Sequence, residues 1–485
     1  MITLSIASSR RATRALAAVA VRVARRAGGK GATEVAQSGA SAAASCAARG
    51  LDTPQSRTVA TRRTLRAARG AAKAALGALL LAAPTMAEVK PGDVVNAANL
   101  EAAREWLTPG LEWCVRRGMT LRVAAPRPIE APAPYREATE RFAPQVRLGS
   151  DRLTLQNYVA GLPFPVIDPA DPQAAVKVMW NSEYKWLATD DLDARDFDAD
   201  AGAIGRDGAG MRVERHFVLG YLRRLFFTGR LFVDPKPVWP NPDGIRYRES
   251  LHPVVEPADL RGVGMTSVRY VAPTRPDESW LYLPNLRRVR RLSSAQRSDP
   301  LFNQDIDADS YFGYSGQVGW MDWKFLGERT VLAPMHGEHL PVQWGAGSAD
   351  FAFDDVWEPR QVYVVEGTSK LPQYAYAKRV LYVDKDTWVV PLSDLYARDG
   401  QLWKVWLNLF SFRREPFAGA KTSVYPSDMG FSPAVVMVDI AADHATRVAL
   451  PSRTSGSEGW FFNMGDRLGL SEDWFKIAHL IQTAP

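Results

Sequence analysis

Cysteine is nearly absent from this 485-residue chain, which holds two, Cys46 and Cys114. Cys46 lies in a basic N-terminal stretch that we expect to be removed, so Cys114 is left as a single thiol and no internal disulfide can form. A nucleophilic Cys114 would need a histidine brought beside it by the fold. The alternative is a partly buried structural thiol, which needs no such partner.

Long apolar runs and catalytic motifs are also lacking. No stretch beyond the N-terminal region approaches the roughly 20 apolar residues that cross a bilayer as a helix. The sequence has no Gly-x-Ser-x-Gly elbow, Gly-x-Gly-x-x-Gly loop or Gly-Lys-Ser/Thr phosphate loop. Hydrolase and nucleotide-binding functions therefore have no motif support, and we expect no catalytic residue, no metal and no cofactor.

Acidic residues are missing from the first 87 positions, apart from Glu34 and Asp52. This stretch holds 14 of the 60 basic residues and 2 of the 53 acidic ones, so the remainder carries a formal net charge of −5. The basic overall charge belongs to the N-terminal stretch and gives no argument for nucleic-acid binding.

The end of this stretch has the three parts of a secretory signal peptide. Basic residues at 62–69 precede an apolar core at 74–83, and small residues at Thr85 and Ala87 suit cleavage after Ala87. We expect a signal peptide at about 60–87 and a soluble exported protein. Residues 1–58 are interpreted as an over-called start; their composition would also suit an organellar transit peptide.

Aromatic and β-branched residues dominate the C-terminal half. Strands are predicted at 279–284, 361–366, 374–383 and 401–407, bounded by turn signals such as Asp399-Gly400. In the first of these, Trp280 and Tyr282 lie on one side and Leu281 and Leu283 on the other. A strand that is apolar on both sides must pack on protein with one face, while the other lines a second core or a cavity.

Two acidic repeats and one histidine pair could bind a metal. Asp196, Asp198 and Asp200 alternate as in a calcium loop, but Ala201 occupies the place of the glycine that the sharp turn needs. The whole stretch at 189–210 is predicted to be a solvated acidic loop, and the similar repeat at 305–309 shows that this spacing recurs. His336-Gly-Glu338-His339 lacks the helical spacing of a zinc motif and is predicted to be a surface turn.

Four arginines surround Val289, at 287, 288, 290 and 291. Clustered charge of this kind could bind acidic headgroups or nucleic acid. As a short strand, however, the segment places arginines on both faces, which is typical of an edge strand protected against aggregation. We favour the edge strand.

Three regions are expected. Residues 1–87 are the leader; residues 88–215 are an N-terminal helical and proline-rich arm region leading into the sheet; residues 216–485 are an antiparallel β half-barrel with a C-terminal helix at 471–482. Within the second region, helix is predicted at 96–117 with a break at Pro109-Gly110, and an extended arm at 124–144.

Six motifs, in order, resemble the bacterial exported family catalogued as domain of unknown function 1329. They are YVAGLPFP at 158–165, VKVMWN at 176–181, YLPNLRRVRR at 282–291, DWKFLG at 322–327, YAKRVLYVD at 376–384 and GQLWK at 400–404. The resemblance covers residues 90–485. The central part also resembles, more distantly, outer-membrane lipoprotein-sorting proteins of the Lol type.

These resemblances imply a mainly β (α+β) fold: a large antiparallel, unclosed β-barrel of the lipoprotein-carrier type with a few packing helices. They imply a periplasmic, non-enzymatic carrier or accessory protein for a lipid or other hydrophobic molecule. Its expected partners are an exporter of the resistance-nodulation-division class and outer-membrane proteins. A periplasmic hydrolase acting on a lipid or polymer, and a structural envelope protein, are the alternatives. We expect a mature chain that is monomeric or weakly associating.

The same resemblance, with the doubly apolar strands, suggests which side chains line the cavity. The residues expected to contact the ligand are Trp280, Tyr282, Tyr376, Trp403 and Trp406. The alternative is that these aromatic side chains form ordinary core.

Overall fold

A computed structural model describes residues 89–206, 208–293, 296–414, 429–452 and 459–483. The predicted leader, with its cleavage after Ala87, lies outside these residues. The helices are α4 (Leu100–Ala103), α5 (Pro109–Arg116), α6 (Ala133–Phe142), α7 (Ala174–Glu183) and α8 (Ile477–Gln482). Across the described residues, no helix has both the length and the apolar composition that crossing a bilayer requires.

Sixteen strands of the described chain join in one large sheet. They are β1 (Val94–Val95), β2 (Leu121–Val123), β5 (Asp191–Ala203), β6 (Arg212–Phe226), β7 (Ile245–Glu256), β8 (Gly264–Tyr270), β9 (Glu278–Leu283), β10 (Arg288–Leu292), β11 (Met321–Ala333), β12 (Val356–Ser369), β13 (Lys378–Asp384), β14 (Leu392–Tyr396), β15 (Leu402–Arg413), β16 (Met429–Asp439), β17 (His444–Ala449) and β18 (Trp460–Phe462). A separate pair is formed by β3 (Arg147–Leu148) and β4 (Leu155–Gln156).

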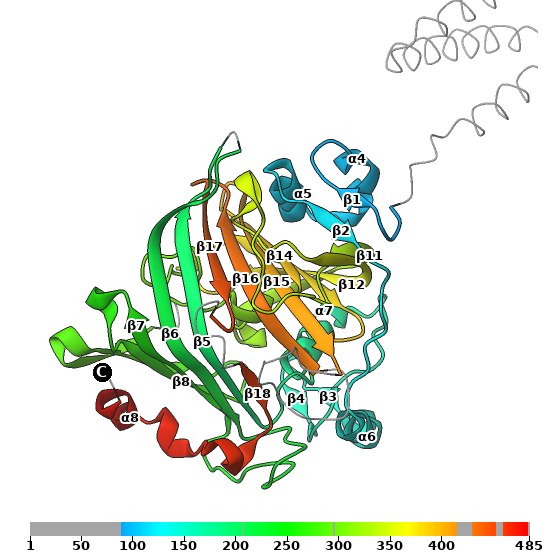
Figure 1. Ribbon diagram of the computed structural model, residues 1–485. Helices are drawn as coiled ribbons and strands as arrows, with labels where there is room; N and C mark the ends of the chain where they lie inside the picture. Colours follow the sequence, from blue (N-terminus) through cyan, green and yellow to red (C-terminus); the bar gives the residue numbers. More distant parts are fainter. Residues whose placement is uncertain (1–88, 207, 294–295, 415–428, 453–458, 484–485) are drawn as a thin grey trace, which may run out of the picture. The chain divides into compact units, whose positions relative to one another are not determined.

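The sheet is curved and open. Its strand order is β1-β2-β12-β13-β14-β15-β16-β17-β5-β6-β7-β8-β9-β10, with β11 beside β12 and β18 beside β5 (Figure 1). All pairings are antiparallel except β2 with β12. The predicted fold class, a mainly β chain with a large unclosed sheet and few packing helices, is confirmed.

Strands β12 to β16 are buried on both faces. Helix α5 covers one face of β14 and β15, where the backbone N–H of Gly110 donates to Asp394 Oδ1 at 3.1 Å. A Cβ at position 110 would lie 2.3 Å from that oxygen, so glycine is needed for this close approach. Pro109 and Gly110 therefore begin a helix, capped by the Thr108 hydroxyl.

The opposite edge of the sheet has its outer face covered by the C-terminal segment. The Arg223 guanidinium lies between Tyr221 and Trp474, 3.9 and 3.8 Å from their ring centres. Trp280 and Trp474 pack against a small core that contains Phe475 and Leu225. The predicted helix at 471–482 is interrupted at Lys476, which has extended backbone, and α8 follows it.

The prediction of an acidic loop at 189–210 is wrong, because β5 occupies most of this stretch. Asp191 and Asp193 are fully buried and Asp198 is 9% exposed. Each has a partner: backbone N–H groups of Met464 and Gly465 donate to Asp191, while Arg223 lies 3.0 Å from Asp193 and the Ser452 hydroxyl donates to Asp198. These partners lie far away in sequence, and they satisfy carboxylates that would otherwise stay in water.

Several smaller predictions also have clear outcomes. The proline-rich arm at 124–144 contains helix α6, which begins with proline at its second position, where the missing N–H costs nothing. Strand β10 is an exposed edge strand paired to β9 alone, as predicted for the arginine segment. Strands β5 and β6 belong to the sheet, so the sheet extends N-terminal to residue 216, where the half-barrel was predicted to begin.

Candidate functional site

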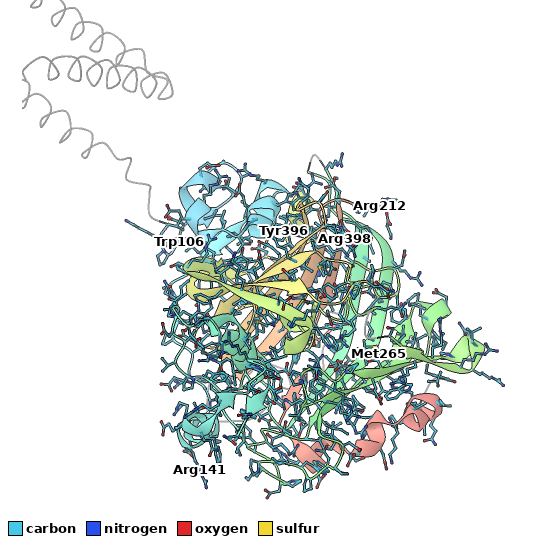
Figure 2. All side chains as sticks on the ribbon, turned by 180° about the vertical axis from the view of Figure 1, so that it is seen from behind. Trp106, Arg141, Arg212, Met265, Tyr396 and Arg398 are labelled. Atoms are coloured by element: carbon cyan, nitrogen blue, oxygen red, sulfur yellow. The ribbon has the colours of Figure 1, made fainter. Side chains whose placement is uncertain are left out.

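The inner face of the β6–β9 edge carries a row of aliphatic side chains. Leu222, Leu251, Met265 and Leu281 are direct cross-strand partners on four neighbouring strands. Paired residues point to the same face of a sheet, so these four form one apolar row. Figure 2 labels Met265 on β8.

An internal segment, residues 296–320, covers this row. It connects β10 to β11 and is called the inner segment below. Two adjacent cavities, of about 250 and 70 Å³, lie between it and the sheet. Both cavities have Leu251, Leu301 and Phe302 in their walls, so they lie side by side. The larger is lined mainly by aliphatic side chains, including Val254, Met265, Leu281 and Leu292.

The inner segment has an uncommon backbone where it touches the cavities. Phe302, Asn303 and Phe312 have φ values of 50°, 67° and 56°, in the left-handed region. Bulky side chains rarely adopt this conformation, and it persists where surrounding contacts impose it. Phe302 lines both cavities and Phe312 lines the smaller one. Two of the three left-handed residues, Phe302 and Phe312, therefore shape the cavity walls.

Buried polar contacts hold the inner segment on the sheet. The acidic repeat at 305–309, whose spacing recurs from 196–200, supplies two of its anchors. Asp305 accepts from the Thr446 hydroxyl at 2.8 Å and lies 2.7 Å from His444 Nδ1, and this hydrogen bond raises the pKa of His444. Asp307 accepts from the Tyr376 hydroxyl at 2.6 Å, and burial raises its pKa. Sequence reasoning missed this role because the partners come from β17 and from the segment just before β13.

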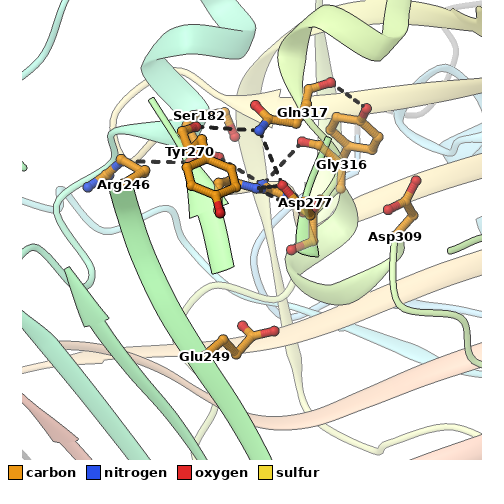
Figure 3. Close-up of polar contacts among 12 residues, drawn as sticks. Ser182, Arg246, Glu249, Tyr270, Asp277, Asp309, Gly316 and Gln317 are labelled. Atoms are coloured by element: carbon orange, nitrogen blue, oxygen red, sulfur yellow. Dashed lines mark hydrogen bonds and ion pairs between the residues drawn. The ribbon is translucent and has the colours of Figure 1, made fainter. Parts of the chain in front are cut away.

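An ionic network fixes the same segment from the other side. Arg269 Nη2 lies 2.7 Å from Asp277 Oδ2, and Arg297 Nη1 of the inner segment lies 3.5 Å from the same oxygen. Arg297 Nε donates to Asp309 Oδ1 at 2.5 Å. Burial alone would lower the pKa of Arg297, but the carboxylates of Asp309 and Asp277 raise it. Figure 3 shows Asp277 beside Gln317, whose side-chain amide donates to Asp277 Oδ1 at 3.2 Å.

The histidines of the predicted surface turn are held by separate carboxylates. His336 Nδ1 lies 2.7 Å from Glu358 and His339 Nδ1 lies 3.3 Å from Asp355. His336 is buried, so the turn is not wholly at the surface. Among the described residues, no group of three or more His, Cys, Asp or Glu side chains could hold a metal ion. Cys114 is buried, and its burial raises the pKa of its thiol.

Comparison with known families identifies the chain. A family model described as a protein of unknown function, DUF1329, matches residues 94–470. The chain belongs to this family. The resemblance predicted from the six ordered motifs is confirmed. The chain is also similar to a Pseudomonas aeruginosa protein described as uncharacterized, PA3922, with 26% identity over 344 residues, covering 67% of this chain and 70% of the relative.

Solved structures similar to this DUF1329 chain include three bacterial proteins. A DUF1329 family protein from Desulfovibrio piger has a TM-score of 0.43 and 17% identity, covering 64% of this chain and 100% of its own. A putative outer membrane lipoprotein-sorting protein domain from Vibrio parahaemolyticus has a TM-score of 0.42 and 15% identity, with the same coverage. A LolA superfamily protein from Nitrosomonas europaea, NE2245, has a TM-score of 0.35 and 13% identity, covering 63% and 98%.

The five aromatic residues expected to contact a ligand do not lie together in this DUF1329 structure. Trp406 is fully buried and lines the smaller cavity. Tyr376 and Trp403 pack together, with ring centres 5.4 Å apart, where Tyr376 anchors the inner segment. Trp280 and Tyr282 alternate with Leu281, so they point away from the cavity that Leu281 lines. The ligand-binding role of the five stays a prediction.

Proposed function

We propose that this protein is a non-enzymatic carrier or accessory protein of the periplasm that binds a lipid or another hydrophobic molecule. The observation that carries the proposal is the apolar cavity of about 250 Å³ between the aliphatic row of β6–β9 and the inner segment. Each Å² of apolar surface removed from water contributes about 25 cal/mol of binding free energy. Such a cavity can therefore hold an apolar ligand by burial alone, with no catalysed reaction.

The way the cavity is closed supports a carrier. Its cover is a connecting segment rather than a strand of the sheet, and buried side-chain contacts hold that segment in place. Phe302, whose backbone is in the left-handed region, belongs to the wall shared by the two cavities. The periplasmic location rests on the leader pattern at 60–87, and an exporter and outer-membrane proteins remain the proposed partners.

Binding of an uncharged apolar probe tests the proposal. Protein purified without detergent should enhance the fluorescence of N-phenyl-1-naphthylamine saturably. Leu251→Trp, which fills the wall common to both cavities, should weaken binding at least tenfold, because the larger ring occupies the ligand's space. Met265→Trp serves as a second variant should the first fold poorly.

Leu286→Trp is the matched control, since Leu286 is 62% exposed and absent from the cavity walls. It should bind the probe like the wild type. Lack of saturable binding, or equal binding by all four proteins, would contradict the carrier function. If the probe binds as expected, mass spectrometry of molecules extracted from the wild type identifies any natural ligand.

A further inference from the structure

The inner face of the β6–β9 edge changes character one row beyond the aliphatic side chains. Arg224, Glu249, Ser267 and Ser279 are cross-strand partners on the same four strands. Each lies two residues from a member of the aliphatic row, which is about 7 Å along a strand. The surface beneath the inner segment is therefore apolar at one end and polar at the other.

A third cavity, of about 50 Å³, lies at the polar end. Its walls include Lys185, Arg224 and Glu183. It shares Phe312, Ser432 and Trp460 with the 70 Å³ cavity, so the three cavities follow one another from the aliphatic row to the charged end. About 10–15 Å³ admits one water molecule, so 50 Å³ admits a group the size of a carboxylate.

Lys185 supplies positive charge to this end. Arg224 is paired with Glu249, and the carboxylate oxygens of Glu183 lie 3.8 Å from Arg246 and Arg269. Lys185 Nζ donates to the backbone carbonyl of Ser182 at 2.8 Å, and within the described residues it forms no ion pair up to 4.0 Å. An ammonium group has three donors, so two remain for a ligand.

We propose that the cavities take a single-chain amphiphile with an anionic headgroup, its carboxylate bound by Lys185 beside Arg224 and its apolar chain lying along the aliphatic row. This proposal rests on the proposed function and names the class of ligand. A cationic headgroup is disfavoured because Arg224 and Arg246 each have a carboxylate partner, whereas Lys185 forms no ion pair among the described residues and leaves a positive charge at this end. The size of the third cavity favours a carboxylate over a bulkier phosphate ester.

Competition between ligands of equal chain length tests the headgroup. Hexadecanoate, hexadecyl phosphate and hexadecanol are compared at pH 7 by displacement of N-phenyl-1-naphthylamine. The wild type should bind hexadecanoate about ten- to a hundredfold more tightly than hexadecanol, as expected for a charge-assisted hydrogen bond. Tighter binding of hexadecyl phosphate than of hexadecanoate would overturn the carboxylate assignment.

Variants at position 185 locate the headgroup. Lys185→Met should remove the preference for hexadecanoate and leave hexadecanol binding unchanged, while Lys185→Arg should keep the preference. Lys185→Gln, which retains a donor for the Ser182 carbonyl, replaces the methionine variant if that one folds poorly. Lys370→Met, at an exposed lysine, is the control and should behave as the wild type.

The pH dependence of ligand binding gives an independent readout. Burial lowers the pKa of Lys185 to about 8, although the Glu183 carboxylate favours its charge; Arg224 and Arg246 oppose that charge. The preference for hexadecanoate should therefore decline as the pH rises above 8 in the wild type and persist in Lys185→Arg. An unchanged preference in Lys185→Met overturns the headgroup site but leaves the carrier standing, whereas failure of all three ligands to displace the probe overturns both.

Discussion

The two halves of the large sheet bury their inner faces in different ways. Strands β12 to β16 are almost wholly buried: Leu381 and Trp406 have no exposed surface. Strands β6 to β9 are only partly buried along the aliphatic row and leave the larger cavity there. The difference shows that the aromatic half of this protein builds the support, while the aliphatic half leaves the space.

The reason lies in what faces each half. Large aromatic side chains fill the volume beneath β12 to β16, with Trp388 stacked on Tyr363 at 5.5 Å and Trp403 against Tyr376. The aliphatic row is covered by the inner segment, which is fixed by ionic and hydrogen-bonded anchors and by Ile306 and Val318, two side chains buried in the main core. A buried charge needs a polar partner and not close-packed methyl groups. The cavities can therefore remain between the anchors of the inner segment and the aliphatic row.

The largest effect should come from breaking an anchor. Asp277→Ala removes the carboxylate that lies 2.7 Å from Arg269, whose side chain is 3% exposed, and the cost should be about 3–5 kcal/mol of unfolding free energy. Urea denaturation followed by tryptophan fluorescence measures it. Asp322→Ala removes an exposed partner of Lys370 and should cost less than about 1 kcal/mol. Equal costs would show that the network does not hold the fold.

A smaller effect should separate the two halves directly. Leu381→Ala in β13 leaves a void in close-packed core and should cost about 3 kcal/mol. Met265→Ala removes a side chain that already borders a cavity, and should cost about 1 kcal/mol. The same urea titrations compare the two. If the methionine variant is as destabilised as the leucine variant, the space beside β8 is occupied by packed protein.

Some of this contrast could be predicted from the sequence. The doubly apolar strand at 279–284 correctly required protein on one face and a second core or cavity on the other, and the structure places the core with Phe475 beside Trp280 and the cavity beside Leu281. Composition could not show which face of the strand packs on the core and which lines the cavity. We expected aromatic residues to line the cavity because they dominate the strands, yet the larger of the two cavities beneath the inner segment is lined mainly by aliphatic residues.

The anchors and the aliphatic row could not be predicted, for a physical reason. Leu222, Leu251, Met265 and Leu281 become neighbours only through the register of four strands. A one-residue shift in register would turn each to the other face. The buried aspartates of β5 were hidden in the same way, although the spacing of Asp191 and Asp193, and that of Asp198 and Asp200, has the period of a strand and could have indicated one.

The smallest effect concerns a titrating carboxyl group in the packed half. Asp394 is fully buried between α5 and β13, accepts from the Tyr382 hydroxyl at 3.0 Å, and burial raises its pKa to about 7. The folded state therefore holds a proton that the unfolded chain, with an aspartate pKa near 3.9, releases. The stability that this proton provides is complete below about pH 4 and is lost as the pH rises through 7.

Asp394→Asn should remove this dependence, because the amide resembles the protonated acid: its oxygen can accept from Gly110 and its nitrogen can donate to Tyr382. Between pH 5 and pH 8 the wild type should lose about 2 kcal/mol of unfolding free energy relative to the variant, since each pH unit within the window is worth up to about 1.4 kcal/mol. Urea titrations at the two pH values measure the difference, with Asp322→Asn as the exposed control. A variant that instead gains stability relative to the wild type as the pH falls would show that Asp394 is ionised in the folded protein, and that the packed half tolerates a charge beneath α5.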